Sequence, residues 1–249
     1  MMHTVVSTSI NREGLADYFS SFVHRWGGIC VCEERKFIYM KPAKTAGTSI
    51  LRHVLEPNVV GIIHEKNHPD AFQTWLNRVT DQELESYFIF SVVRNPWDRL
   101  VSITSYFQIS PQDFIRDFSV YQETPIIRLH SLPQAIYTHR QGQPFVNQIC
   151  RFETLQADFN LVCDRIGLER QQLPVVNRSL HAHYSRYFTL EGRERVHEIY
   201  QEDIAYFGYM FEQLPPLREK ARVWLMDRKR HLAKRLKKRG KRHESIEGR

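Results

Sequence analysis

The sequence predicts an α/β domain built on a mostly parallel sheet. Short runs of aromatic and branched residues alternate with segments of helical spacing, which is the pattern of parallel strands joined by helices. Residues 88–93, FIFSVV, form a near-continuous apolar run, as expected of a strand buried on both faces. Residues 36–55 and 87–107 each read as a strand, a tight turn with polar and basic residues, and a helix. These two strand–turn–helix units define the centre of the predicted fold.

The other strands are predicted from length and composition. Short segments rich in apolar residues, bounded by turn residues, lie at 36–41, 61–63 and 146–152. Residues 121–145 carry three prolines and are expected to form a surface insertion.

Helices are predicted from spacing and from start and stop signals. Pro57 is expected to stop the helix that begins at Thr48, because proline has no backbone N–H. Thr80 with Glu83 makes a capping box, and Pro96 suits the first turn of a helix. Helical segments are therefore predicted at 48–55, after Thr80, and at 96–109, 112–118, 154–166 and 190–206.

The charge of the chain is unevenly distributed. Residues 218–249 hold 14 Lys and Arg against 4 Asp and Glu, whereas the rest holds 21 against 24, so the net charge of +7 comes from this end. We expect a catalytic domain at 1–216, a basic helical arm at 217–245 and, at 246–249, a protease-recognition sequence of the kind left by expression tags. The arm has three readings: a solvated helix, a contact with an anionic membrane surface or acidic glycan, or non-specific nucleic-acid binding. No specific nucleic-acid site is expected.

The sequence predicts neither a membrane span nor a metal site. No stretch approaches 18 apolar residues, and the first 19 residues lack the pattern of a signal peptide. The cysteines lack the two close pairs of a zinc site and fit a reducing compartment: Cys30, Cys32, Cys150 and Cys163. We expect a cytoplasmic protein, with peripheral contact at a membrane surface through the arm as the alternative. The oligomeric state is not indicated.

The turn of the first unit carries groups that bind phosphate. They are Lys44, Thr45, Ala46, Gly47, Thr48 and Ser49. Small residues let the backbone wrap an anion, and the N–H groups and dipole of the following helix favour negative charge. The Walker A pattern is absent, because the lysine comes three residues before the glycine. The alternative is a lysine-bearing loop that happens to precede a helix.

The second unit offers Arg94 at the end of its strand and Ser102 about two turns into its helix. A guanidinium suits phosphate oxygens, and Ser102 could reach the same group. Arg99 is nearby and could instead pair with Asp98 or Asp203.

Together the two segments resemble the cofactor signatures of sulfotransferases that use 3′-phosphoadenosine-5′-phosphosulfate (PAPS), closest to the carbohydrate-type branch with its soluble bacterial relatives. The resemblance rests on PAKTAGTS and VVRNPWDRLVS, with weaker support from RFETLQADF and residues 176–209. It implies a three-layer α/β fold like that of nucleotide kinases, with PAPS as donor, 3′,5′-ADP as product and no metal. The first segment would hold the 5′-phosphosulfate and the second the 3′-phosphate. Arg178, in a late loop that tends to close near the cofactor in this family, would bind the 3′-phosphate or an anionic acceptor.

The resemblance also implies roles in the reaction. Lys44 would stabilise charge on the leaving oxygen. The family's base falls between the two segments, where His68 is the first candidate, His64 the second and Glu65 the third. The acceptor would be a hydroxyl or amine of a carbohydrate, glycolipid or small natural product. Two alternatives are a P-loop phosphotransferase that uses ATP and magnesium, and a non-catalytic nucleotide-binding protein.

Overall fold

The computed structural model describes residues 28–64, 69–176 and 181–213. The basic arm predicted at 217–245, and any membrane contact through it, lie outside this part. A five-stranded sheet forms the centre, with its strands in the order β3 (Ile62–His64), β1 (Ile29–Cys32), β2 (Phe37–Met40), β4 (Phe88–Val93) and β7 (Gln148–Arg151). A small hairpin joins β5 (His139–Arg140) and β6 (Gln143–Pro144).

Four of the five strands in this sheet run in one direction. β2, β4 and β7 pair in parallel, whereas β1 is antiparallel to both of its neighbours, β2 and β3. The mostly parallel sheet is therefore confirmed, with β1 as the reversed strand. The sequence analysis did not predict β1, although all four of its residues are fully buried.

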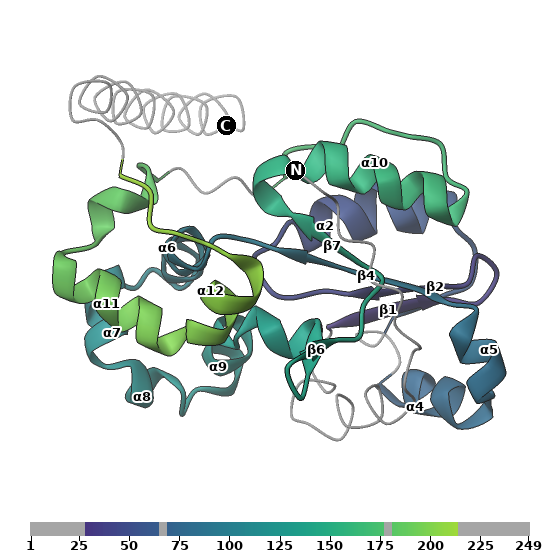
Figure 1. Cartoon of the computed structure of the whole chain (residues 1–249), viewed down its shortest axis with the longest axis horizontal. Helices are drawn as coiled ribbons and strands as arrows, with labels where there is room; N and C mark the ends of the chain where they lie inside the picture. The colour runs from purple at the N-terminus through teal and green to yellow at the C-terminus, as the bar shows by residue number, and fades with distance from the viewer. Residues whose placement is uncertain (1–27, 65–68, 177–180, 214–249) are drawn as a thin grey trace, which may run out of the picture.

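Helices cover both faces of the sheet, which confirms the three-layer arrangement (Figure 1). One face packs against α4 (Pro69–Arg78) and α5 (Asp81–Glu85) through Phe72, Trp75 and Leu84. The other face packs against the helix that follows β2 and against α10 (Leu155–Ile166). Alternate residues of β2 point to opposite layers, with Ile38 in the first and Tyr39 in the second, as the two-residue period of a strand requires.

The remaining helices lie together beyond the end of the sheet where β4 leads into α6 (Figure 1). They share an aromatic-rich core that includes Trp97, Phe114 and Tyr200. These elements are α6 (Pro96–Phe107), α7 (Pro111–Arg116), α8 (Phe118–Tyr121), α9 (Pro125–Ser131), η5 (Tyr184–Tyr187), α11 (Leu190–Ile199) and α12 (Gln201–Phe207). Two other short turns are η3 (Gln134–Tyr137), which adds Tyr137 to the core under α4, and η4 (Phe152–Thr154), which leads into α10.

The helix after β2 does not stop at Pro57, so that prediction was wrong. It runs as α2 (Gly47–Ile50), a π-helical turn η2 (Leu51–Leu55) and α3 (Glu56–Asn58). Pro57 lies within the first turn of α3, where a missing N–H removes few helical hydrogen bonds. The capping box at Thr80 and the helix end at Gly167 are confirmed.

Two further predictions were wrong in detail. Residues 121–145 are not a surface insertion, because α9, η3 and the loop between them bury Leu129, Gln134 and Tyr137. The predicted helix at 190–206 breaks at Tyr200 into α11 and α12. Long-range contacts, which local composition does not encode, produce both differences.

Two searches of the described residues gave negative results. No helix there combines the length and the hydrophobicity needed to span a bilayer. Across the same ranges, no group of three or more His, Cys, Asp or Glu side chains is placed to hold a metal ion.

The stability of the α4 layer should depend on Trp75, which is 1% exposed and packs edge-on against Tyr87 with ring centres 5.3 Å apart. We expect Trp75→Ala to lower the free energy of unfolding by about 3–5 kcal/mol through lost burial and a cavity, measured by urea denaturation. Val60→Ala, at a side chain 79% exposed, is the control and should change it by less than about 0.5 kcal/mol. Equal losses in both variants would contradict the packing argument.

Candidate functional site

The two predicted phosphate-binding turns lie next to each other. β2 and β4 pair in parallel, with Met40 opposite Ser91, so the segments that follow them leave the same edge of the sheet. The turns also touch, because Arg94 Nη1 donates a hydrogen bond to the Lys44 carbonyl oxygen at 3.2 Å. Residues 50 positions apart in the chain are thus joined at the carboxyl ends of parallel strands, where open α/β sheets bind ligands.

The first turn has an unusual backbone. Lys44 and Ala46 both have φ of 67°, a left-handed conformation that side chains disfavour. Thr45 is fully buried and its hydroxyl donates to the Pro42 carbonyl oxygen at 2.8 Å, so this side chain braces the turn. Ala46, at the helix N-cap, supplies no side-chain acceptor. The first N–H groups of α2 are therefore left without a capping side chain, as an anion-binding helix start requires.

Gly47 makes room for a neighbouring side chain. A Cβ built there would lie 2.7 Å from Cγ and Cδ of Lys41, so the missing side chain makes room for the lysine stem. The predicted role of this small residue, to let the backbone wrap an anion, stays a prediction. Thr48 is half-buried and Ser49 is buried at the start of the same helix.

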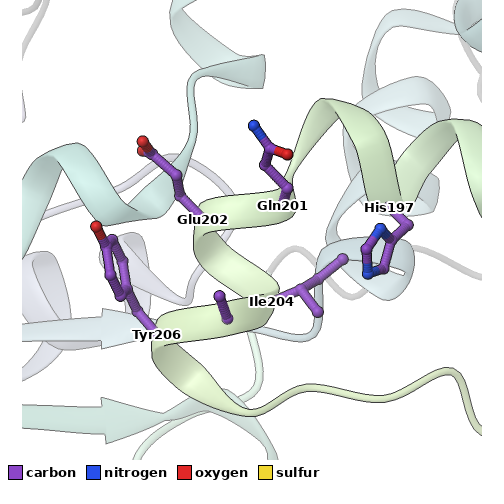
Figure 2. Close-up of a pocket in the computed structure, with 6 residues that line it drawn as sticks. His197, Gln201, Glu202, Ile204 and Tyr206 are labelled. Atoms are coloured by element: carbon purple, nitrogen blue, oxygen red, sulfur yellow. The ribbon is translucent and has the colours of Figure 1, made fainter. Parts of the chain in front are cut away.

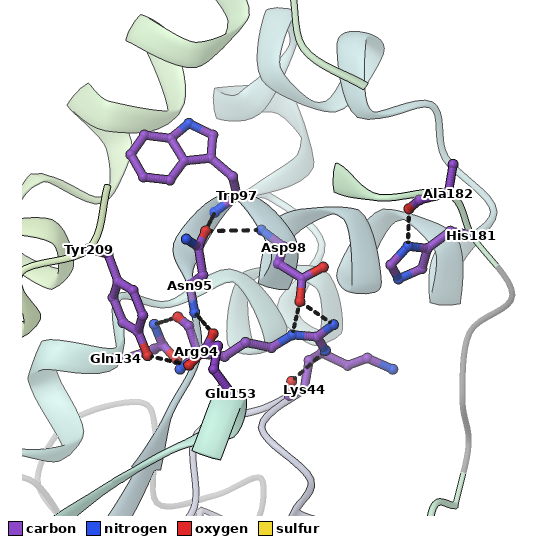
Figure 3. A network of polar contacts seen from close by, with 10 residues as sticks. All are labelled: Lys44, Arg94, Asn95, Trp97, Asp98, Gln134, Glu153, His181, Ala182 and Tyr209. Atoms are coloured by element: carbon purple, nitrogen blue, oxygen red, sulfur yellow. Dashed lines mark hydrogen bonds and ion pairs between the residues drawn. The ribbon is translucent and has the colours of Figure 1, made fainter. Parts of the chain in front are cut away.

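Arg94 is 8% exposed and is held on several sides (Figure 3). Its Nε donates to Asp98 Oδ2 at 2.8 Å, and Nη2 pairs with the same oxygen at 2.7 Å. The guanidinium carbon lies 4.1 Å from the centre of the Phe152 ring. The partner of Asp98 is therefore Arg94 and not Arg99, one of the two alternatives that the sequence left open.

The backbone of Arg94 is clamped by a buried glutamine. Gln134 accepts from the Arg94 N–H at 2.8 Å and donates to its carbonyl oxygen at 2.9 Å. Asp203, from α12, accepts from the backbone N–H of Gln134 and of Ala135, and from Gln134 Nε2. Burial raises the pKa of Asp203, and these donors together with Arg99 oppose that rise.

The start of α6 is anchored by Asn95. Its side-chain oxygen accepts from the N–H groups of Trp97 and Asp98, and its own N–H donates to Glu153 at 2.7 Å. Glu153 also accepts from the Tyr209 hydroxyl at 2.9 Å. Figure 3 shows this network beside Arg94, with the Lys44 side chain extending away from the guanidinium.

Arg99 joins two segments that lie far apart in sequence. It is 1% exposed, and it donates from Nε to the Ala43 carbonyl oxygen and from Nη2 to the His130 carbonyl oxygen, both at 2.9 Å. Its Nη1 has no hydrogen-bond partner among the described residues. Arg99 thus fixes the turn after β2 against the end of α9.

Lys44 lies in an electropositive setting. Burial and the charge of Arg94 both lower its pKa. Its ammonium lies 4.3 Å from the centre of the Tyr106 ring. Tyr106 is 60% exposed. Two cations with one nearby carboxylate, Asp98, form a site that favours an anion.

The structure describes only some of the other candidates. His68, Glu65 and Arg178 lie outside the described residues. His64 ends β3 and pairs with Cys30, so its backbone lies at the same edge of the sheet as the end of β2, two strands or about 10 Å away. Ser102 is buried on α6 without a hydrogen bond to Arg94.

Sequence reasoning missed three parts of this site. Asp98 was named only as a partner of Arg99, Gln134 was placed in a surface insertion, and His130 was not considered. The apolar residues around positions 126–137 were a signal that this segment is buried. No local pattern indicated which buried groups they would meet.

A shallow pocket of about 420 Å³ lies elsewhere, on α11 and α12 (Figure 2). His197, Gln201, Ile204 and Tyr206 are among the residues that line it, and it shares none with the two turns. We assign it no role in the phosphate site.

In a comparison with protein-family models, residues 28–210 match the model of a sulfotransferase family. This range contains both turns, Arg99 and the helices that hold them. No curated protein sequence matches the chain.

Arg99 should matter for stability because it satisfies two backbone carbonyl groups from a buried position. We expect Arg99→Lys to lower the free energy of unfolding by about 1.5–3 kcal/mol, since one ammonium cannot bridge both carbonyls. The measurement is urea denaturation, with Arg195→Lys as a matched control at an exposed ion pair to Glu198. A loss no larger than that of the control would show that the bridge is dispensable.

Proposed function

The chain belongs to the sulfotransferase family, and we propose that it uses PAPS as the sulfuryl donor for a hydroxyl or amine of a carbohydrate, glycolipid or small natural product. The observation that carries the proposal is the contact of the two turns through Arg94 and the Lys44 carbonyl group. Two adjoining cationic turns suit a ligand with phosphates at two positions. The residues fit PAPS in three respects: an uncapped helix start, a half-buried lysine and a buried arginine.

In this proposal each turn holds one end of the donor. The N–H groups that begin α2, with Thr48 and Ser49, bind the 5′-phosphate, and Thr45, Ala46 and Gly47 shape the backbone around it. Arg94 and Ser102 bind the 3′-phosphate, with Arg178 as a further candidate. Arg94 already pairs with Asp98, so the 3′-phosphate would share a guanidinium whose orientation is fixed beforehand.

PAPS, when bound, supplies the sulfuryl group and leaves as 3′,5′-ADP. Lys44 stabilises the negative charge that develops on the leaving oxygen. Its partial burial strengthens this interaction, because the ammonium is less hydrated than on an open surface. For the acceptor proton, the sequence proposes His68, then His64 and Glu65. No metal ion is needed in this scheme, because lysine and arginine supply the positive charge.

The alternative of an ATP-dependent phosphotransferase has less support. Arg94 ends the strand where such an enzyme would place a magnesium-binding aspartate, and the turn lacks the Walker lysine position. Asp98, the nearest carboxylate, pairs with Arg94.

Binding of 3′,5′-ADP tests the donor site without knowledge of the acceptor. We expect calorimetry to give tighter binding of 3′,5′-ADP than of ADP with magnesium or of AMP. Arg94→Gln should weaken 3′,5′-ADP binding by about 10–100-fold, the loss of one charge-assisted contact, and leave AMP binding almost unchanged. Equal affinity of the wild-type protein for ADP and 3′,5′-ADP would refute the proposal.

Turnover tests the role of Lys44. In an acceptor screen that follows release of 3′,5′-ADP, we expect Lys44→Ala to lower kcat by about 100–1000-fold, as for removal of one group that stabilises a developing anion. Its affinity for 3′,5′-ADP should fall much less. Lys36→Ala, at an exposed lysine before β2, is the control. A kcat near that of the wild type would remove Lys44 from the reaction.

A further inference from the structure

One aromatic side chain beside the first turn has no role in the scheme above. The Lys44 ammonium lies 4.3 Å from the centre of the Tyr106 ring, within the range over which an aromatic face attracts a cation. Tyr106 lies near the end of α6 and is 60% exposed. The lysine that is proposed to stabilise the leaving oxygen therefore rests on a residue from another element of the fold.

Neighbouring rings hold Tyr106 in place. The His130 imidazole stacks on it with ring centres 5.5 Å apart and planes 13° apart. Phe107 packs edge-on against both of these rings, with centres 5.0 Å and 5.1 Å away. The imidazole is itself oriented, because its Nδ1 lies 2.8 Å from the Ile126 carbonyl oxygen. These contacts limit the rotamers of a tyrosine that is otherwise open to solvent.

Arg99 closes the contacts into a loop. It is 1% exposed, and it donates to the Ala43 carbonyl oxygen and to the His130 carbonyl oxygen, both at 2.9 Å. Ala43 precedes Lys44, and the lysine ammonium reaches the Tyr106 ring. That ring stacks on His130, which completes the loop. One buried arginine thus fixes both the backbone beside the lysine and the ring that its ammonium contacts.

The surroundings of Lys44 oppose its positive charge, and the ring favours it. Burial and the nearby Arg94 both lower the pKa of Lys44, so they disfavour the charged form that the proposed role requires. Asp98, the nearest carboxylate, pairs with Arg94. The face of the Tyr106 ring acts in the opposite direction, because it attracts the ammonium and not the neutral amine.

The imidazole that stacks on the tyrosine adds no competing charge. Burial lowers the pKa of His130, and three nearby cations lower it further: Lys44, Arg99 and Lys41. A hydrogen bond to a backbone carbonyl group opposes them. A histidine with a pKa below about 6.5 is neutral at neutral pH, so the cation beside the ring is the lysine.

We propose that Tyr106 is a positioning residue for Lys44, and that its ring face holds the lysine ammonium ready for the leaving oxygen of the donor. The inference deepens the proposed sulfuryl transfer and rests on it. Tyr106 touches no reacting atom in this scheme and acts only through the lysine. Because the flexible lysine stem is ordered beforehand, less conformational freedom is lost when the donor binds.

The role belongs to the ring face of Tyr106 and not to its hydroxyl group. The short distance runs from the lysine ammonium to the centre of the ring, where the π-electron density attracts a cation. Phenylalanine presents the same face, so Tyr106→Phe should preserve the contact. Leucine is apolar without an aromatic face, so Tyr106→Leu should abolish it. The two variants separate the attraction of the ring from its bulk.

Trace labelling with acetic anhydride tests the contact in the donor-free protein, without an acceptor. The reagent acylates neutral amines, so the pH at half-maximal labelling of Lys44 reports the charge of that lysine. We expect Tyr106→Leu to lower this midpoint and to raise labelling at neutral pH about 2–5-fold, the loss of one exposed cation–π contact. Tyr106→Phe should label like the wild type. A lysine that is merely more accessible would show a higher maximum rate with an unmoved midpoint.

Tyr206→Leu is the matched control variant. Tyr206 is 40% exposed and stacks on His139 with ring centres 4.2 Å apart, in the pocket of α11 and α12. Lys36, an exposed lysine before β2, is the internal reference and should label equally in every variant. An unmoved Lys44 midpoint in Tyr106→Leu overturns the proposal. An equal shift in Tyr106→Phe does so too, since the ring face would then not be the cause.

Turnover tests the consequence for the reaction. With water as the probe acceptor, release of 3′,5′-ADP from PAPS reports stabilisation of the leaving oxygen. We expect Tyr106→Leu to lower kcat about 2–5-fold and to leave KM for PAPS nearly unchanged, because the charge on the leaving oxygen develops only in the transition state. Tyr106→Phe should restore the rate. A wild-type kcat in Tyr106→Leu overturns the positioning role.

Addition of 3′,5′-ADP separates failure of this proposal from failure of the proposed function. In the wild-type protein, bound 3′,5′-ADP should slow labelling of Lys44 about tenfold or more at neutral pH, because a phosphate beside the lysine favours its charged form. Such protection, with an unmoved midpoint in Tyr106→Leu, leaves the proposed function standing and removes Tyr106 alone. Failure of the wild-type protein to bind 3′,5′-ADP overturns both.

Discussion

The site depends on the parallel pairing of β2 with β4. Parallel neighbours end at the same edge, so two turns separated by 50 residues in the chain emerge side by side, and Arg94 reaches the Lys44 carbonyl group. The pairing is buried between two helical layers, with Phe90 stacked on Tyr39 at 4.7 Å. Slippage of this register by one residue would exchange the faces of every side chain, so the packing of both layers fixes the geometry of the turns.

Buried hydrogen bonds then connect the two turns to the helices beyond the sheet. Asp203 on α12 holds Gln134, and Gln134 holds the backbone of Arg94. Arg99 connects the phosphate turn with α9. In a low-dielectric interior an unpartnered polar group is costly, so each of these side chains favours one arrangement of its partners. The helices beyond the sheet therefore fix the positions of the site residues, and they also enclose a second hydrophobic core.

The same packing brings together the charged groups of the site. Lys44 and Arg94 lie near each other, and one carboxylate, Asp98, pairs with Arg94. The charge of Arg94 lowers the pKa of Lys44, and the charges of Lys44, Arg99 and Lys41 lower the pKa of His130. The proposed binding of a phosphorylated donor and the lowered pKa of His130 thus follow from one arrangement of charges.

Local chemistry determined much of this architecture from the sequence alone. Apolar runs predicted β2, β3, β4 and β7, capping and stop signals predicted most helices, and the two turns, with the sulfotransferase resemblance, were recognised by residue type and spacing. The reversed strand β1 was not predicted, because a four-residue apolar run does not specify its partner or direction. The buried 121–145 segment was wrongly assigned to the surface, since prolines also begin helices such as α9.

Only the tertiary structure decided which charged groups meet. The sequence offered Asp98 or Asp203 as a partner of Arg99, and it gave no reason to connect His130 with Lys44 or Asp203 with Gln134. Such contacts join residues 30 to 90 positions apart, and they form because the sheet and its covering helices bring distant backbone segments together. Propensity and periodicity act over a few residues, so a contact set by packing between elements is invisible to them.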